Sequence, residues 1–124
     1  LVVRDNVTDS FTITTSLTVP AGGYLVFGRN GDTATNGGVT VNYVYSGMNL
    51  ANSGDRIEIL NGATIIDSVV YGPGFPLTAG VAMNLNPLFF TAIANDTASN
   101  WCPAIVLYNG VDKGTPGASN SSCP

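Results

Sequence analysis

The chain is a series of short apolar runs of four to eight residues, separated by glycine, asparagine, aspartate or proline. Valine, isoleucine, threonine, tyrosine and phenylalanine dominate these runs, and such residues favour pleated strands. Runs of this length bounded by turn residues are typical of strands, whereas an amphipathic helix needs a longer segment with apolar residues every three or four positions. The sequence therefore predicts an all-β chain with almost no helix.

We expect strands at seven places, which are residues 1–4, 10–14, 24–28, 40–45, 56–60, 64–71 and 81–85. Residues 24–27 (YLVF) are apolar on both faces, which predicts a central strand. Asn61-Gly62 predicts a hairpin with a type I′ turn, because that turn needs positive φ at both central residues. Short strands with turns every eight to twelve residues indicate an antiparallel β-sandwich.

The length of 124 residues fits one domain with a buried core. Residues 1–86 hold the expected strands, and residues 87–124 are rich in glycine, proline, serine and asparagine. We therefore expect a strand-rich core at 1–86 and a loop-rich C-terminal closure at 87–124.

Cys102 and Cys123 are the only cysteines. An even pair in a chain with few charges and several glycosylation sequons predicts a disulfide that closes the tail. The alternative is two free thiols in a reducing compartment.

Charge and composition exclude several function classes. The net charge is −4, and the four cations Arg4, Arg29, Arg56 and Lys113 are scattered, so direct nucleic-acid binding is not expected. No apolar run reaches the length of about 18 to 20 residues that a membrane span needs. The chain has no histidine, which removes the commonest general base and zinc ligand.

Two groups of polar residues are weak candidates for chemistry. Residues 30–32 (NGD) and 36–38 (NGG) supply oxygens for a calcium loop, but they lack the spaced carboxylates of an EF-hand, and a polar loop is the simpler interpretation. Glu58 and Asp67 lie on two expected strands and could form a paired-carboxylate site, although acidic residues on strands are commonly solvent-facing or cross-strand partners. We expect no catalytic residue, no cofactor, no metal site and no enzymatic activity.

Asn6, Asn95 and Asn120 begin N-glycosylation sequons in expected loops, although a chain this rich in asparagine, serine and threonine also produces sequons by chance. Tyr43 and Tyr45 share a strand face and Tyr108 lies in the tail. These tyrosines, with Trp101, are either core residues or a platform for glycan contact.

Five segments in order resemble the lamin-tail domain, also called the intermediate-filament tail domain, and in particular its secreted bacterial branch. They are residues 20–29 (PAGGYLVFGR), 52–60 (NSGDRIEIL), 66–72 (IDSVVYG), 100–104 (NWCPA) and 114–120 (GTPGASN), and the likeness as a whole extends over nearly the entire chain. The resemblance implies an immunoglobulin-like sandwich, an extracellular or cell-surface location, a C-terminal closure that includes the cysteine pair, and no catalytic residues.

Family members usually open with two strands that precede the segment matched by residues 1–4, and this sequence lacks them. We expect these strands to lie upstream in the same polypeptide or to come from a neighbouring copy, since a sandwich without them leaves backbone groups and an apolar face open. Strand donation between copies would build a filament. The sequence thus favours a non-catalytic extracellular assembly module that associates with copies of itself. The alternatives are an accessory binding domain of a larger secreted hydrolase or nuclease, and a carbohydrate-binding module.

Overall fold

The structure, a computed structural model, describes residues 1–5 and 8–124. These residues form short strands, long connections and two 3₁₀ turns, which confirms the prediction of a mostly β chain. The elements in chain order are β1 (Val2–Arg4), β2 (Ser10–Thr12), β3 (Phe27–Gly28), β4 (Tyr43–Val44), β5 (Asp55–Asn61), β6 (Thr64–Tyr71), β7 (Met83–Leu85), η1 (Ala94–Asp96), η2 (Ala98–Asn100) and β8 (Trp101–Pro103).

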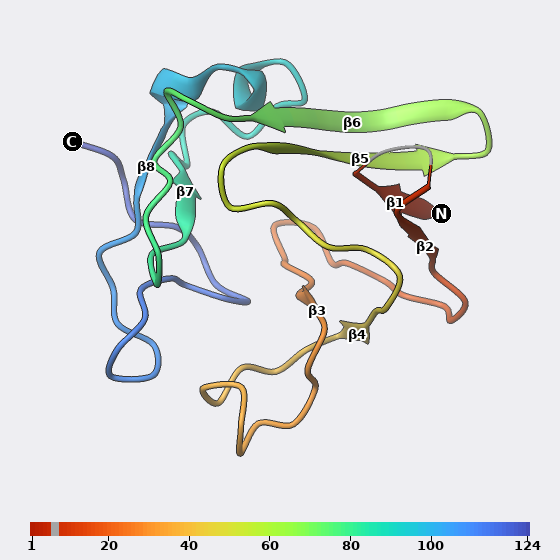
Figure 1. Ribbon diagram of the computed structural model, residues 1–124, viewed down its shortest axis with the longest axis horizontal. Coiled ribbons are helices and arrows are strands. Elements are labelled where there is room, and N and C mark those ends of the chain that lie inside the picture. The colour runs from red at the N-terminus through yellow and green to blue at the C-terminus, as the bar shows by residue number, and fades with distance from the viewer. Residues whose placement is uncertain (6–7) are drawn as a thin grey trace.

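The largest sheet has four antiparallel strands in the order β2-β1-β5-β6. Its long hairpin, β5–β6, runs across one side of the molecule (Figure 1). The strand predicted at 64–71 is observed with the same bounds, and the strand predicted at 56–60 is one residue longer at each end. A register shift between Ile59 and Leu60 marks a bulge, which increases the local twist of the hairpin.

The β5–β6 turn is present, but the predicted turn type is wrong. Asn61 pairs with Thr64, so the two central residues are Gly62 and Ala63. Gly62 has φ +59°, and no non-glycine residue in the described part of the chain has positive φ. A glycine alone at the first central position matches a type II′ turn, in which Asn61 stays in the strand.

Two smaller pairs of strands complete the fold. The first, β3–β4, is parallel and two residues long, so the predicted central strand at 24–28 and the predicted strand at 40–45 are much shorter than expected. The second, β7–β8, is antiparallel and joins Met83–Leu85 to Trp101–Pro103. The sequence did not predict β8, which lies in the expected loop region.

The core lies between the four-stranded sheet and the β3–β4 pair. Val3, Phe11 and Met48 are buried at its centre. The ring of Phe11 stacks on Tyr45 with centroids 4.5 Å apart and meets Phe27 edge-on at 6.0 Å. Ring pairs in these geometries add to the stabilisation that burial itself provides. The core is small, because no large side chain among the described residues is fully buried.

The C-terminal tail is fastened to β7 and β8. Cys102 and Cys123 form the predicted disulfide, with Cα atoms 5.8 Å apart, so the alternative of two free thiols is wrong. The buried amide of Asn84 donates to the carbonyl of Ser121 over 2.9 Å, and the amide of Asn120 donates to the carbonyl of Leu85 over 2.9 Å. Among the residues that the structure describes, none of the helical segments has the length and apolar character to cross a bilayer.

Candidate functional site

The two carboxylates considered as a catalytic pair do not meet. Glu58 accepts hydrogen bonds from Arg4 (2.7 Å) and Ser68 (3.4 Å), whereas Asp67 accepts one from the amide of Asn95 (2.8 Å). Ser68 and Asp67 are adjacent on β6, so their side chains point to opposite faces of the sheet. Glu58 and Asp67 are therefore not placed to act together as a catalytic pair.

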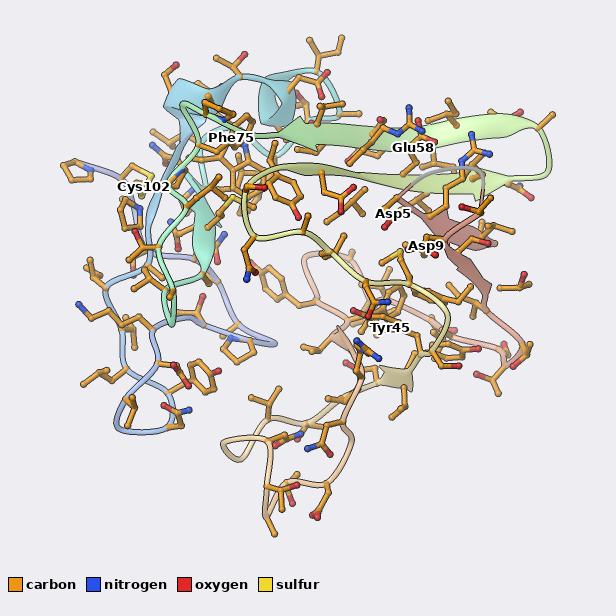
Figure 2. The ribbon with its side chains drawn as sticks, in the orientation of Figure 1. Asp5, Asp9, Tyr45, Glu58, Phe75 and Cys102 are labelled. Atoms are coloured by element: carbon orange, nitrogen blue, oxygen red, sulfur yellow. A yellow bond between two sulfur atoms is a disulfide. The ribbon has the colours of Figure 1, made fainter. Side chains whose placement is uncertain are left out.

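Glu58 is instead the centre of an ion cluster on the outer face of the sheet. Its side chain is 6% exposed, and the guanidinium groups of Arg4 and Arg56 lie 2.7 Å and 3.6 Å from its two oxygens. The hydrogen bond from Arg4 lowers the pKa of Glu58, while desolvation opposes that shift and the charge of Arg56 reinforces it. Figure 2 shows Glu58 on the strands, well apart from Cys102 and the closed tail. The cluster joins β1, β5 and β6 and therefore has a structural role.

The polar loop at residues 30–38 uses its oxygens internally. Asn30 accepts from the backbone of Asp32, Asp32 accepts from the backbone of Ala34, and Asn36 accepts from the backbone of Val39. These are the local hydrogen bonds by which asparagine and aspartate stabilise turns. Across residues 1–5 and 8–124, no three His, Cys, Asp or Glu side chains are grouped to hold a metal ion.

Two of the three sequon asparagines are used as structural amides. Asn95 is buried and donates to Asp67, and Asn120 donates to the carbonyl of Leu85 while accepting from Thr115. A glycan attached to either nitrogen competes with these bonds. Asn6 lies outside the described residues. Glycosylation remains a prediction at all three positions.

The aromatic residues divide into two groups. Tyr43 and Tyr45 pack on Phe11, and Trp101 is half-buried with its indole N–H donating to the carbonyl of Asn95 over 2.7 Å. Tyr108, by contrast, is 39% exposed, and so is Tyr24 at 41%. The sequence placed Tyr24 in a central strand, whereas the chain there is irregular and the ring reaches the surface.

The most unusual property of the molecule is the surface that it leaves uncovered. A compact protein of 12.8 kDa is expected to expose about 6,300 Å², and this chain exposes 7522 Å². The difference of about 1,200 Å² is comparable to what one partner buries in a large protein–protein interface. Many large apolar side chains are exposed on this surface.

The first uncovered feature is the β6 edge. This strand pairs with β5 on one side, and the structure gives it no backbone hydrogen bond to any other described residue. Ile65, Ile66 and Val70 are 50%, 51% and 64% exposed along it. A long edge strand with exposed apolar residues is a template for pairing with another chain.

The second feature is the loop that leads into η1, which lies beside β6 (Figure 1). Leu88, Phe90 and Ile93 are 80%, 51% and 84% exposed there. Ile66 and Val70 on the strand and these three residues on the neighbouring loop are what we call the β6 surface. Monomeric proteins rarely leave so many large apolar side chains exposed in neighbouring segments, and such patches mark interaction sites.

The third feature is a cleft between the four-stranded sheet and β7. It has a volume of about 500 Å³ and is lined by Leu50, Ile57, Tyr71 and Met83 among others. Tyr71 is buried at its end and donates to the carbonyl of Ala51 over 2.7 Å. Burial raises the pKa of Tyr71, and the charges of Asp55 and Asp5 raise it further. The inner face of the β5–β6 hairpin is thus only partly covered by β7.

A smaller hollow of about 210 Å³ adjoins this cleft and is lined by Asp67, Asn95 and Trp101 together with apolar residues. The side-chain oxygen of Asn95 is buried there without a hydrogen bond to any described residue. An unmet buried acceptor is a site that a donor from water or from another chain would satisfy.

Comparisons with models of known protein families, with curated proteins and with solved structures find no match to this chain. The likeness to the lamin-tail domain therefore stays a prediction from the sequence.

Proposed function

We propose that this chain is a non-catalytic, extracellular structural module that assembles with copies of itself. The observation that carries the proposal is the excess surface of about 1,200 Å², which matches one partner's share of a large interface. In this proposal the domain is a lamin-tail-like immunoglobulin sandwich whose apolar surface is covered between neighbours.

The β6 surface is the proposed contact. An incoming strand would meet the unpaired side of β6 and add main-chain hydrogen bonds, and its side chains would pack against Ile66 and Val70. The one charged residue of β6 is Asp67, whose carboxylate already accepts a hydrogen bond from the amide of Asn95. The strand therefore lacks the lysines and prolines that commonly protect an edge from pairing.

A filament requires that the incoming strand is not β6 itself. Pairing of β6 with β6 of a second copy closes a dimer, whereas pairing of β6 with a different segment leaves a free β6 on every added copy. When the rotation between copies does not close a ring, the second arrangement adds copies without limit, and it is the one that we propose.

The extracellular location is supported by the Cys102–Cys123 disulfide, because disulfides persist in oxidising compartments. It is also supported by the composition. Charged residues make up only 10% of the chain, so serine, threonine and asparagine supply most of its polarity.

Electron microscopy of the purified protein and two variants tests the proposal. The unmodified chain is expected to form filaments, and the double variant Ile66→Lys, Val70→Lys is expected to form none, because lysine on an edge strand blocks pairing. Val111→Lys places a single lysine at a residue that is 80% exposed away from β6, and it is expected to leave the filaments intact. Filaments in the double variant, or their absence in the unmodified chain, would contradict the proposal.

A further inference from the structure

A groove on the other side of the molecule from β6 has the character of a ligand site. It has a volume of about 570 Å³, within the range of sites for small molecules, and lies between residues 37–42 and 106–118. Tyr24 and Tyr108 line it, and they are the exposed tyrosines that take no part in the core. Assembly through β6 neither requires nor explains this groove.

Tyr108 is held in a fixed position. A Cβ atom added at Gly37 would come within 3.0 Å of the ring, and one added at Gly114 would come within 3.7 Å, so the ring rests against backbone on two sides. Gly37 has φ +83°, a conformation that other residues rarely adopt. The backbone of Gly114 also donates to Val106 over 2.8 Å, which closes the loop that carries Tyr108. A ring held in this way loses little conformational entropy when a ligand packs on it.

The lining of the groove is uncharged. No aspartate, glutamate, lysine or arginine is among its residues, nor among those of the adjoining hollow that shares Tyr108 and Thr115. Charged ligands are recognised by opposite charges, so this groove suits a neutral ligand.

Its polar groups both donate and accept. The oxygen of Asn42 accepts from the backbone of Val26 over 2.7 Å, which leaves its amide nitrogen as a donor with no partner among the described residues. The Thr40 hydroxyl is likewise without a hydrogen bond to the described chain, and a hydroxyl both donates and accepts. Sugar hydroxyls also do both, whereas a proline-rich peptide offers only carbonyl acceptors because proline lacks an N–H.

We propose that the groove between residues 37–42 and 106–118 binds a neutral oligosaccharide, with sugar rings stacked on Tyr24 and Tyr108. The amide of Asn42 and the hydroxyl of Thr40 bind the sugar hydroxyls. Of the aromatic residues that the sequence suggested as a platform, the site keeps Tyr108, whereas Tyr43, Tyr45 and Trp101 are engaged in packing.

The test is an NMR titration of the ¹⁵N-labelled chain with cellotetraose, xylotetraose, mannotetraose and chitotetraose, and with decaproline for comparison. At least one of the four sugars is expected to shift the amide signals of residues 37–42 and 106–118. Tyr24→Ala and Tyr108→Ala are each expected to weaken that binding about tenfold, since stacking on one ring is worth roughly that factor. Phe90→Ala removes a ring that is 51% exposed outside the groove and is expected to leave binding unchanged.

Three results would overturn the inference. They are the absence of shifts with all four sugars, shifts that persist when both tyrosines are removed, and tyrosine-dependent binding of decaproline without binding of any sugar. Tyr24 makes no ring contact or side-chain hydrogen bond in the described structure, so Tyr24→Ala tests binding even if Tyr108→Ala fails to fold.

Discussion

The side-chain nitrogen of Asn95 lies 2.8 Å from Oδ2 of Asp67, and this hydrogen bond fastens η1 to the edge strand β6. The indole N–H of Trp101, the first residue of β8, also donates to the carbonyl of Asn95. Asn95 therefore connects β8 to the four-stranded sheet.

Replacing Asn95 by alanine is therefore expected to lower the free energy of unfolding by about 1–3 kcal/mol, the usual consequence of leaving a partner without its hydrogen bond. Ser99→Ala, at an exposed residue of the same segment, is the matched control. Urea denaturation of protein from a host without N-glycosylation measures both variants and separates the packing role of Asn95 from any glycan. Equal midpoints for the two variants would show that the bond does not stabilise the fold.

The Glu58 cluster predicts loss of stability in acid. Since Arg4 lowers the pKa of Glu58 in the folded state, the unfolded chain takes up the proton first as the pH falls. The stabilisation is complete above the unfolded pKa of about 4.3 and disappears as the pH falls through the lower, folded value. Glu58→Gln is expected to destabilise the protein by about 1–2 kcal/mol at neutral pH and to flatten this part of the pH profile. Urea midpoints measured from neutral to acid pH test this, and parallel profiles for the two proteins would refute it.

The disulfide is expected to stabilise the closed tail. Cys102 and Cys123 are 21 residues apart, and closing a loop of this size is worth about 3 kcal/mol in the chain-entropy model. A variant with alanine at both positions is expected to lose about that amount and to expose residues 103–124 to hydrogen exchange. Unchanged protection in this segment would mean that Asn84 and Asn120 hold the tail without the disulfide.

The β5–β6 turn allows a matched pair of glycine substitutions. A Cβ atom added at Gly62 or at Gly72 meets no atom within 4 Å, but only Gly62 has positive φ, at +59°. Gly62→Ala is expected to destabilise the protein by about 1–2 kcal/mol, because a left-handed conformation is unfavourable for alanine. Gly72→Ala is expected to be neutral or slightly stabilising. Thermal unfolding of both variants measures the difference, and equal effects would contradict the type II′ turn.

The longest hairpin was predictable from sequence, because its signals are local. The alternating isoleucines before Asn61 and the β-branched run that follows Gly62 define β5 and β6 whatever the rest of the chain does. The turn type was not predictable from the dipeptide, because Asn61 pairs with Thr64 and stays in the strand, which leaves Gly62 and Ala63 as the central residues.

The strand predictions were wrong where two strands that pair are far apart in the sequence. Residues 24–27 have strong strand propensity, but only Phe27 finds a partner strand, and Tyr24 faces the groove. Conversely β8 ends in Pro103 and has no alternating pattern, and it forms because Met83–Leu85 lies alongside it. The β6 surface and the groove could not be predicted from local sequence either, because they depend on which strands remain unpaired and which loops come together.

We propose that copies of this chain cover the surface that a single copy leaves open. Sedimentation velocity of the unmodified, disulfide-bonded protein over a wide concentration range tests it most directly. We predict species that grow well beyond the monomer mass of 12.8 kDa as the concentration rises. A single monomeric species at every concentration would contradict the claim.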